Sequence, residues 1–238
     1  MSKKKIKIIE GSGFLAKHFK KYSNHLKKLD VIIYAAGVSN SLAKNSGIFK
    51  RDLKRLKIFI KQNRKKIIYL STYSIFDKSR NKSNYVKNKI KIENFIRKNC
   101  SKYIIVRFPE LIGKNKNPNT LTNFFFNKIK YRKKFIIWKN AKRNLLDVED
   151  AIKICLFFIE KNKDNNKVIN ILNKRFYSPL YIVKELENIL KVKSKFTLLN
   201  IKLKKWKVYN SVNNKITSNL KISFGDTYLI KTLKKYYN

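Results

Sequence analysis

Five short apolar runs, three of them followed by segments of helical pattern, constrain the fold of this chain more than any other feature. The clearest, DVIIYAAG at residues 30–37, is apolar almost throughout, as expected of a parallel strand buried on both faces. The others are KIKIIE (5–10), KKIIYLST (65–72), KYIIVRFPE (102–110) and KVINIL (167–172). Strands that alternate with helices imply right-handed crossovers, so the sequence predicts an α/β fold with a doubly wound parallel sheet.

The segments between these runs have helical spacing. FLAKHFKKY (14–22) follows the first run, and residues 49–62 follow the second. Residues 85–99 follow the third and place four side chains on one stripe: Tyr85, Lys89, Ile92 and Ile96. Lys89 is therefore expected to face the sheet. After about residue 174 the pattern is less regular, with a predicted helix at SPLYIVKELENILK and another near the C-terminus.

The charge of the chain is extreme, with 58 Lys and Arg against 14 Asp and Glu, a formal net charge of +44. A nucleic acid or another polyanion is the obvious partner for such a chain. However, Lys is spread almost evenly and is accompanied by many Asn, Ile, Phe and Tyr, which indicates compositional drift. We therefore expect no specific nucleic-acid partner. Hydrophobic residues at 43% exclude a disordered polyelectrolyte.

Metal and membrane sites are not indicated. Cys100 and Cys155 are too few for a disulfide framework or a metal knuckle, and His18 and His25 have no second ligand cluster. No stretch approaches the roughly 18 apolar residues of a membrane span, and the basic N-terminus lacks the apolar core of a signal peptide. We expect no metal, no membrane span and a cytoplasmic protein.

A glycine-containing turn, GSGFLA at residues 11–16, lies between the first run and the first helix. Glycines let a backbone approach a pyrophosphate, and a helix N-terminus offers free N–H groups. The turn is a candidate phosphate site, with a plain strand-to-helix turn as the alternative.

Seven segments, in this order, resemble the extended short-chain dehydrogenase/reductase family of nucleotide-sugar epimerases, dehydratases and ketoreductases. They are EGSGFLAKHF, DVIIYAAGVSNS, YLSTYSIFD, YVKNK, VRFPELIGKN, RNLLDVEDA and VINILNKRFYSPLYIVKEL. The resemblance implies a Rossmann-like sheet, here reduced in strand number. It also implies a dinucleotide-binding domain at 1–172, within which 110–150 contribute substrate contacts, and a small substrate-binding region at 173–238.

The Tyr-x-x-x-Lys pair of this family matches Tyr85 and Lys89, and among the thirteen tyrosines only Tyr85 has Lys four residues on. The resemblance implies that Tyr85 exchanges a proton with the reacting carbinol or carbonyl and that Thr72 hydrogen-bonds the same oxygen. A phenol is a poor base at neutral pH, and an ammonium one helical turn away favours phenolate. The alternative is an ordinary solvated pair on a helix.

The resemblance also implies the binding residues for a cofactor, NAD or NADP, and for a nucleotide-sugar substrate. The cofactor residues are Gly11, Ser12, Gly13, Phe14, Leu15, Ala35, Ala36, Gly37, Lys89 and Phe108. The substrate residues are Thr72, Tyr73 and Arg143. Arg143 is included because a guanidinium suits phosphate, and the alternative is that it is an ordinary basic residue on the surface. Asp147 and Asp150 are expected to order the helix that follows them.

Several positions depart from the family pattern. The glycine turn aligns with the family if Glu10 occupies the first glycine position and Ala16 the last, and a carboxylate is unfavourable beside a pyrophosphate. The alternative is a shorter Gly-x-Gly-x-x-Ala turn from which Glu10 points away. The chain between 16 and 30 is too short for the two strands and the helix that normally complete the adenosine site, so residues 5–10 become a sheet edge. We expect weak cofactor binding or a second subunit, as in a homodimer, that covers this edge. Tyr73 and Ser74 replace the acid–base pair of the dehydratases, and Glu110 stands where many relatives have Asn.

The sequence thus predicts a nicotinamide-dependent reductase or epimerase of a nucleotide-linked sugar, in surface-polysaccharide synthesis. The alternatives are a non-catalytic nucleotide-binding or regulatory protein that retains the fold and a polyanion-binding protein.

Overall fold

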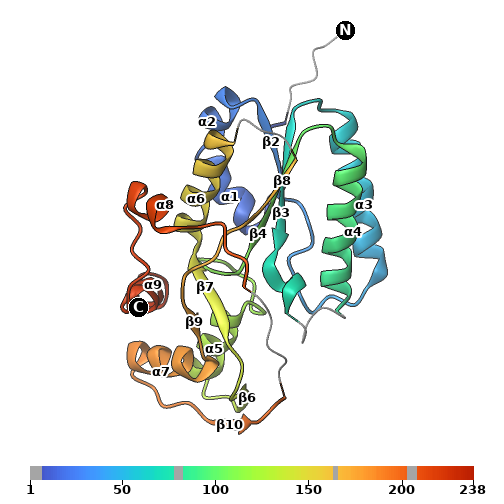
Figure 1. Cartoon of the computed structure of the whole chain (residues 1–238). Helices are drawn as coiled ribbons and strands as arrows, with labels where there is room; N and C mark the ends of the chain where they lie inside the picture. Colours follow the sequence, from blue (N-terminus) through green and yellow to red (C-terminus); the bar gives the residue numbers. More distant parts are fainter. Residues whose placement is uncertain (1–6, 78–82, 163–165, 203–207) are drawn as a thin grey trace. The chain divides into compact units, whose positions relative to one another are not determined.

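The computed structural model describes residues 7–77, 83–162, 166–202 and 208–238, which form two compact units (Figure 1). The first unit contains residues 1–108 and 152–171, and the second contains 109–151 and 172–238. The first unit is therefore discontinuous in sequence. Residues 110–150, expected to contribute substrate contacts from within the first domain, lie in the second unit.

The first unit is built on a parallel sheet of five strands in the order β1-β2-β3-β4-β8. The strands are β1 (Ile9–Glu10), β2 (Val31–Tyr34), β3 (Lys66–Thr72), β4 (Tyr103–Phe108) and β8 (Lys167–Asn170). The predicted α/β fold with a parallel sheet is thereby confirmed. The short β1 lies at one edge, as the missing strands predicted.

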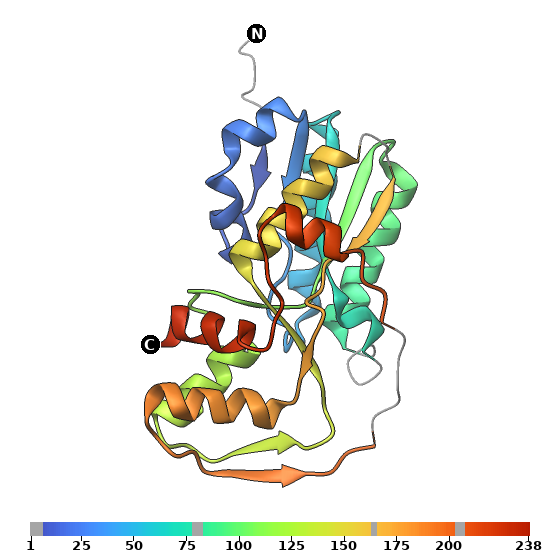
Figure 2. The same ribbon diagram turned by 60° about the vertical axis from the view of Figure 1, so that its left-hand side comes forward.

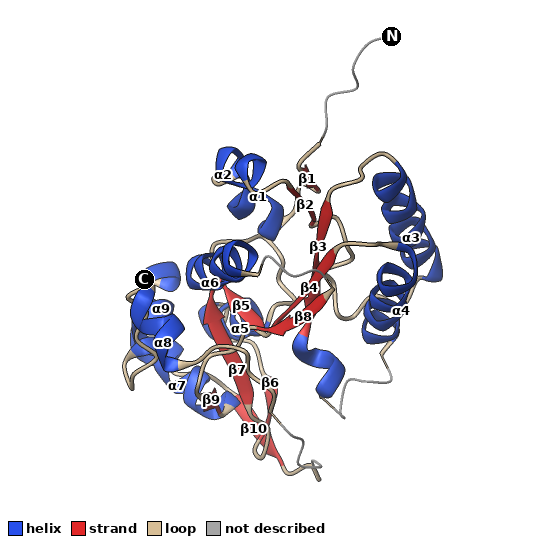
Figure 3. Ribbon diagram, turned by 45° about the horizontal axis from the view of Figure 1, so that its top comes forward, coloured by secondary structure: helices blue, strands red, loops and turns tan. Residues whose placement is uncertain are grey.

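Helices cover both faces of this sheet (Figures 1 and 3). One face carries α1 (Phe14–Lys20), α2 (Ser23–Lys28) and the part of α6 (Val148–Lys161) that belongs to the first unit. The other face carries α3 (Ser46–Lys61) and α4 (Asn84–Asn99). A short 3-10 helix, η1 (Tyr73–Phe76), follows β3.

Caps and apolar stripes explain α3 and α4. The side chain of Asn45 accepts a hydrogen bond from Gly47 N–H at 2.7 Å, and the Ser83 hydroxyl accepts one from Val86 N–H at 3.3 Å, so each helix begins at a capped N-terminus. Their inner stripes pack on β2, β3 and β4 in one cluster of buried side chains: Ile32, Tyr34, Leu56, Phe59, Ile67, Tyr69, Ile92, Ile96, Tyr103 and Ile105. This cluster fixes both helices against the sheet.

The second unit combines short strands with three longer helices, α5 (Leu121–Lys130), α7 (Pro179–Leu190) and α9 (Tyr228–Tyr237). One sheet has the order β5-β7-β9, with β5 (Glu110–Ile112), β7 (Arg143–Asp147) and β9 (Phe176–Tyr177). A parallel pair joins β6 (Phe135–Trp138) to β10 (Phe196–Leu199), side by side in Figure 2. A short helix, α8 (Asn214–Asn219), precedes α9. The three longer helices share one buried apolar cluster with these strands.

Candidate active site

The predicted motifs of the first unit follow the carboxyl ends of four parallel strands and therefore lie at the same end of the sheet. Gly11 follows β1, Ala35 follows β2, Thr72 ends β3 and Phe108 ends β4. In the strand register Thr72 is paired with Phe108. Ala35 N–H also donates to the Glu10 carbonyl at 2.8 Å, which extends the β1–β2 pairing to this end.

The glycine turn packs directly on the loop after β2. Gly11 has φ +132°, a conformation that side chains other than glycine rarely adopt, and a Cβ there would lie 2.6 Å from Ala35 O and 2.9 Å from Ala36 N. Gly13, the N-cap of α1, is the opposite case, since a Cβ there would meet no heavy atom within 4 Å. The turn thus brings two predicted cofactor segments into contact and leaves open space at the start of α1, which fits a pyrophosphate.

Glu10, the carboxylate at the family's first glycine position, is held by two cations. Arg55 of α3 donates through Nε to Oε1 at 2.5 Å, and Lys7 Nζ lies 2.9 Å from Oε2. Burial would raise the pKa of Glu10, but the bonds to Lys7 and Arg55 outweigh it and lower that pKa below its ordinary value. The negative charge that made this position unfavourable for a pyrophosphate is thus paired with Lys7 and with Arg55 of α3.

The ammonium of Lys89 is buried at the carboxyl end of the sheet. Only 5% of the residue is exposed, and Nζ donates to the Leu70 carbonyl at 3.1 Å. The ammonium also lies 5.2 Å from the ring centroid of Tyr69 and 5.7 Å from that of Tyr85. A Cβ at Gly37 would come within 3.1 Å of Nζ. Lys89 therefore joins the end of β3 to the loop after β2 and is not a solvated surface lysine.

Asp52 is a residue of this region that sequence reasoning missed. Its carboxylate, 6% exposed, accepts hydrogen bonds from Tyr34 Oη at 2.9 Å, Val38 N–H at 3.2 Å and Asn88 Nδ2 at 3.1 Å. Burial, and then the charge of Asp52, raise the pKa of Tyr34, so this phenol stays protonated. The available signal was an acidic residue in phase with the buried Leu56 and Phe59 of the same helix.

Tyr85 and Thr72 lie on neighbouring elements, since α4 packs on β3 and η1. Tyr85 is half-buried in the first turn of α4. Thr72 is 8% exposed and its Oγ1 accepts the Ser74 N–H at 3.2 Å, which caps η1. Tyr73 is only 2% exposed, and its ring lies 4.9 Å from that of Phe76, so packing accounts for its side chain.

A second buried carboxylate, that of Glu93, holds the end of β3 and was likewise not predicted from the sequence. Glu93 accepts hydrogen bonds from Ser71 Oγ at 2.6 Å and from two nitrogens of Arg107, at 3.0 and 2.5 Å. It therefore ties α4 to two adjacent strands, and the paired guanidinium compensates its charge.

Arg143 begins β7 in the second unit, where it pairs in the antiparallel register with Tyr177. Its guanidinium carbon lies 6.0 Å from the ring centroid of Trp138. The expected phosphate ligand is thus half-buried beside an aromatic ring, and it is not an isolated surface residue.

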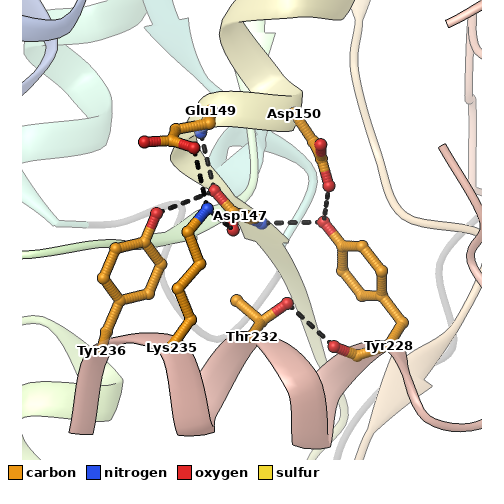
Figure 4. A network of polar contacts seen from close by, with 7 residues as sticks. All are labelled: Asp147, Glu149, Asp150, Tyr228, Thr232, Lys235 and Tyr236. Carbon is orange, nitrogen blue, oxygen red and sulfur yellow. Dashed lines mark hydrogen bonds and ion pairs between the residues drawn. The ribbon is translucent and has the colours of Figure 1, made fainter. Parts of the chain in front are cut away.

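Asp147 and Asp150 order the start of α6, in line with the sequence analysis (Figure 4). Asp147 accepts from Glu149 N–H at 2.7 Å and from Lys235 Nζ at 2.9 Å. Tyr228 donates its hydroxyl to Asp150 at 2.8 Å and accepts from Asp147 N–H at 3.0 Å. These bonds fasten α9 to β7 and the beginning of α6.

Among the described residues, no three His, Cys, Asp or Glu side chains gather where they could hold a metal ion. In the same part of the chain no helix is long and apolar enough to cross a membrane.

Comparison with known proteins decides the family. Residues 16–171, more than half of the chain, match the model of the NAD dependent epimerase/dehydratase family. The chain belongs to this family. The resemblance drawn from the seven sequence segments is thereby confirmed. No curated protein sequence matches this epimerase/dehydratase-family chain.

Solved structures share the fold of this family member at low sequence identity. UDP-glucuronic acid 4-epimerase from Bacillus cereus, in complex with UDP-glucuronic acid and NAD, has 20% identity, a TM-score of 0.67 and covers 90% of this chain and 76% of its own. UDP-N-acetylglucosamine 4-epimerase from Bacillus cereus has 18% identity, a TM-score of 0.65 and 95% coverage of both chains. RMD from Pseudomonas aeruginosa, complexed with NADPH, has 14% identity, a TM-score of 0.66 and 95% coverage of both. The Rossmann-like fold is confirmed, and NAD and NADPH, the predicted cofactor class, are bound in two of these neighbours.

Proposed function

We propose that this member of the family is a nicotinamide-dependent epimerase or reductase of a nucleotide-linked sugar. The observation that supports this most strongly is the buried ammonium of Lys89, held at the carboxyl end of the sheet beside Gly37 and within 5.7 Å of the Tyr85 ring. Burial of a lysine costs free energy, and a solvated Tyr–Lys pair on a helix surface would not incur this cost. Such a lysine beside a tyrosine suits a site that handles a proton.

The first unit supplies the residues that would hold the cofactor, NAD or NADP. We assign the pyrophosphate to the turn Gly11–Ser12–Gly13 and the start of α1 at Phe14 and Leu15. The nicotinamide half is assigned to Ala35, Ala36, Gly37, Lys89 and Phe108. The close approach of Gly11 to Ala35 and the open space at Gly13 support the first assignment. A nicotinamide bound there would supply the hydride acceptor and donor for the sugar carbon.

The protein groups then handle the proton of the reacting oxygen. Tyr85 donates it during reduction and accepts it during oxidation, with the ammonium of Lys89 5.7 Å from the centroid of its ring. Thr72 Oγ1 accepts Ser74 N–H, which leaves its own O–H as the donor that would orient the substrate oxygen. In an epimerase the same groups would serve twice, once for each face of the sugar.

Arg143 is assigned to the substrate, a nucleoside-diphosphate sugar such as the UDP-glucuronic acid bound in the Bacillus cereus neighbour, whereas the buried Tyr73 is not. We further propose a role in surface-polysaccharide synthesis in the cytoplasm and a second subunit at the β1 edge. The two paired residues of β1 leave this edge short, which supports the last proposal.

Cofactor binding and turnover test the proposal separately. We expect purified protein to enhance NADH or NADPH fluorescence, and Lys89→Met to lose this enhancement while its circular dichroism is retained. We expect Tyr85→Phe to bind the cofactor normally but to lose turnover of a panel of UDP-glucose, UDP-N-acetylglucosamine and UDP-glucuronic acid. Tyr131→Phe, at an exposed position, is the matched control. Absence of binding at millimolar NADH and NADPH would refute the assignment.

The short β1 edge also favours a second function, a nucleotide-binding protein without catalysis, because the adenosine part of the site lacks two strands of the family. That reading predicts cofactor binding without turnover of the sugar-nucleotide panel. It also predicts that Tyr85→Phe changes nothing measurable.

A further inference from the structure

The residues assigned to the cofactor hold its pyrophosphate and its nicotinamide half, but not its adenosine end. A pocket of about 240 Å³ lies beside Glu10, which ends β1 and directly precedes the turn assigned to the pyrophosphate. Every residue that lines this pocket belongs to the first unit. Pockets that enclose a whole small ligand measure about 300–1,000 Å³, so this one suits one end of a larger ligand.

The rest of the lining comes from α3. Arg51, Arg55 and Ile58 follow one another at spacings of four and three residues, and Gln62 lies four residues further on, just beyond the helix. These spacings keep the four side chains on one side of α3. No described residue of α4 lines this pocket, so it is separate from the surface that α3 shares with α4.

The carboxylate of Glu10 bears on which ribose the pocket can accept. Dinucleotide sites that take NAD present a carboxylate to the ribose 2′-hydroxyl, whereas those that take NADP present an arginine to the 2′-phosphate. Among the described lining residues Glu10 is the only carboxylate, and both its oxygens are held, Oε1 by Arg55 and Oε2 by Lys7 at 2.9 Å. The described lining therefore lacks the free carboxylate that favours NAD.

Two cations of the pocket have no such partner. Arg51 and Lys54 are both exposed, and within the described ranges neither of them forms an ion pair with a carboxylate. A phosphate monoester carries about −1.5 to −2 charges at pH 7, which two cations match. The planar guanidinium of Arg51 can also bind it through two hydrogen bonds. Ile58, 48% exposed, adds apolar surface on which an adenine ring can pack.

We propose that this pocket binds the adenosine end of NADP and that Arg51, through the 2′-phosphate, makes the chain prefer NADP to NAD. This inference rests on the proposed function, because it extends the cofactor site from Gly11 and Gly13 past Glu10. It requires nothing from the two strands that the chain lacks, since β1 and α3 supply the pocket.

Two isomers of one nucleotide test the pocket without the nicotinamide. Adenosine 2′,5′-bisphosphate carries the 2′-phosphate of NADP, and adenosine 3′,5′-bisphosphate has the same composition and charge with that phosphate moved. We expect the full chain to bind the 2′,5′ isomer at least about tenfold more tightly by isothermal titration calorimetry in about 150 mM NaCl, which screens exposed charges. NADPH should bind more tightly than NADH by a similar factor in nicotinamide fluorescence titrations.

Substitutions locate the binding. Arg51→Gln is expected to weaken the 2′,5′ isomer and NADPH about tenfold or more and to change NADH less than about twofold, because NADH has no 2′-phosphate. Arg132→Gln, at an exposed arginine of the second unit, removes the same charge and should change all three affinities less than about twofold. Ile58→Asn should weaken NADPH and NADH alike, since both carry the adenine ring. Far-ultraviolet circular dichroism verifies that each variant is folded.

Three outcomes overturn the inference. Equal affinity for the two isomers, or equal loss in Arg51→Gln and Arg132→Gln, would show only the general attraction of a basic protein for anions. Tighter binding of NADH than of NADPH would exclude a preference for the 2′-phosphate. The proposed function survives all three as long as one dinucleotide binds. If neither dinucleotide binds but the 2′,5′ isomer does, and Arg51→Gln abolishes this, the proposed function fails while the assignment of the pocket to a 2′-phosphorylated adenosine is retained.

Discussion

Replacement of Gly11 by Ala tests whether the turn after β1 is shaped by close backbone contact. The residue has φ +132°, and a Cβ would lie 2.6 Å from Ala35 O and 2.9 Å from Ala36 N. Neither neighbour can rotate away, because both atoms belong to the backbone of the loop after β2. The new methyl group must therefore push two segments apart.

The magnitude follows from two contributions. An alanine held in a backbone conformation reserved for glycine costs about 1–3 kcal/mol. Overlap of an extra carbon with a packed neighbour costs about 1–3 kcal/mol more. We expect Gly11→Ala to lower the free energy of unfolding by about 2–6 kcal/mol, a large part of the 5–15 kcal/mol typical of a folded domain.

Urea denaturation followed by far-ultraviolet circular dichroism measures this loss, and Gly13→Ala is the matched control. Gly13 has φ −75° and its Cβ would meet nothing within 4 Å, so we expect a change within about 1 kcal/mol. The same methyl group would occupy the space assigned to the pyrophosphate. Gly13→Ala should therefore weaken NADH binding although its stability is retained.

The reasoning is refuted if Gly11→Ala unfolds within about 0.5 kcal/mol of the wild type, the range of a surface substitution. Equal destabilisation by both substitutions would also contradict it, because only one of the two positions is crowded.

Three further predictions concern polar groups away from the turn. Asp52→Ala removes the carboxylate that accepts from Val38 N–H and Asn88 Nδ2, while Tyr34 Oη keeps its bond to the backbone carbonyl of residue 52; the substitution should cost about 2 kcal/mol or more in urea denaturation. Tyr228→Phe removes one hydrogen bond from α9 to the end of β7 and one to the start of α6 and should cost about 2 kcal/mol, whereas exposed Tyr131→Phe should cost nothing measurable. Because the pKa of Glu10 is lowered in the folded state, its ion pair stabilises the protein at pH values above the ordinary pKa of 4.5, and this contribution is lost as the pH falls below 4.5. Arg55→Met should therefore flatten the acid side of the curve of unfolding free energy against pH by about 1 kcal/mol or less. An unchanged curve would contradict the pairing.

The sheet could be predicted because its signal is local. A run such as 30–37 is apolar almost throughout only where both faces are covered, and the observed strand Val31–Tyr34 is buried at every position. The stripe that contains Lys89, Ile92 and Ile96 likewise showed which side of α4 faces the sheet, and all three are buried. Periodicity carries this information without knowledge of the partner.

Long-range polar pairs could not be predicted. Arg55 meets Glu10 across 45 residues, and Arg107 meets Glu93 across 14, yet neither arginine differs in its neighbourhood from the other basic residues of the chain. The unit boundaries were hidden for a related reason. Residues 109–151 follow β4 without a compositional break, and only packing shows that they belong with 172–238.

The discontinuity of the first unit has a consequence for synthesis on the ribosome. Most of α6 and the whole of edge strand β8 belong to that unit but are translated after residues 109–151. A nascent chain that has emerged only to Phe108 therefore exposes the flank of β4 and the part of one sheet face that α6 covers in the complete unit. Translation must continue past residue 171 before that flank is shielded, so a pause before this point would prolong the aggregation-prone stage.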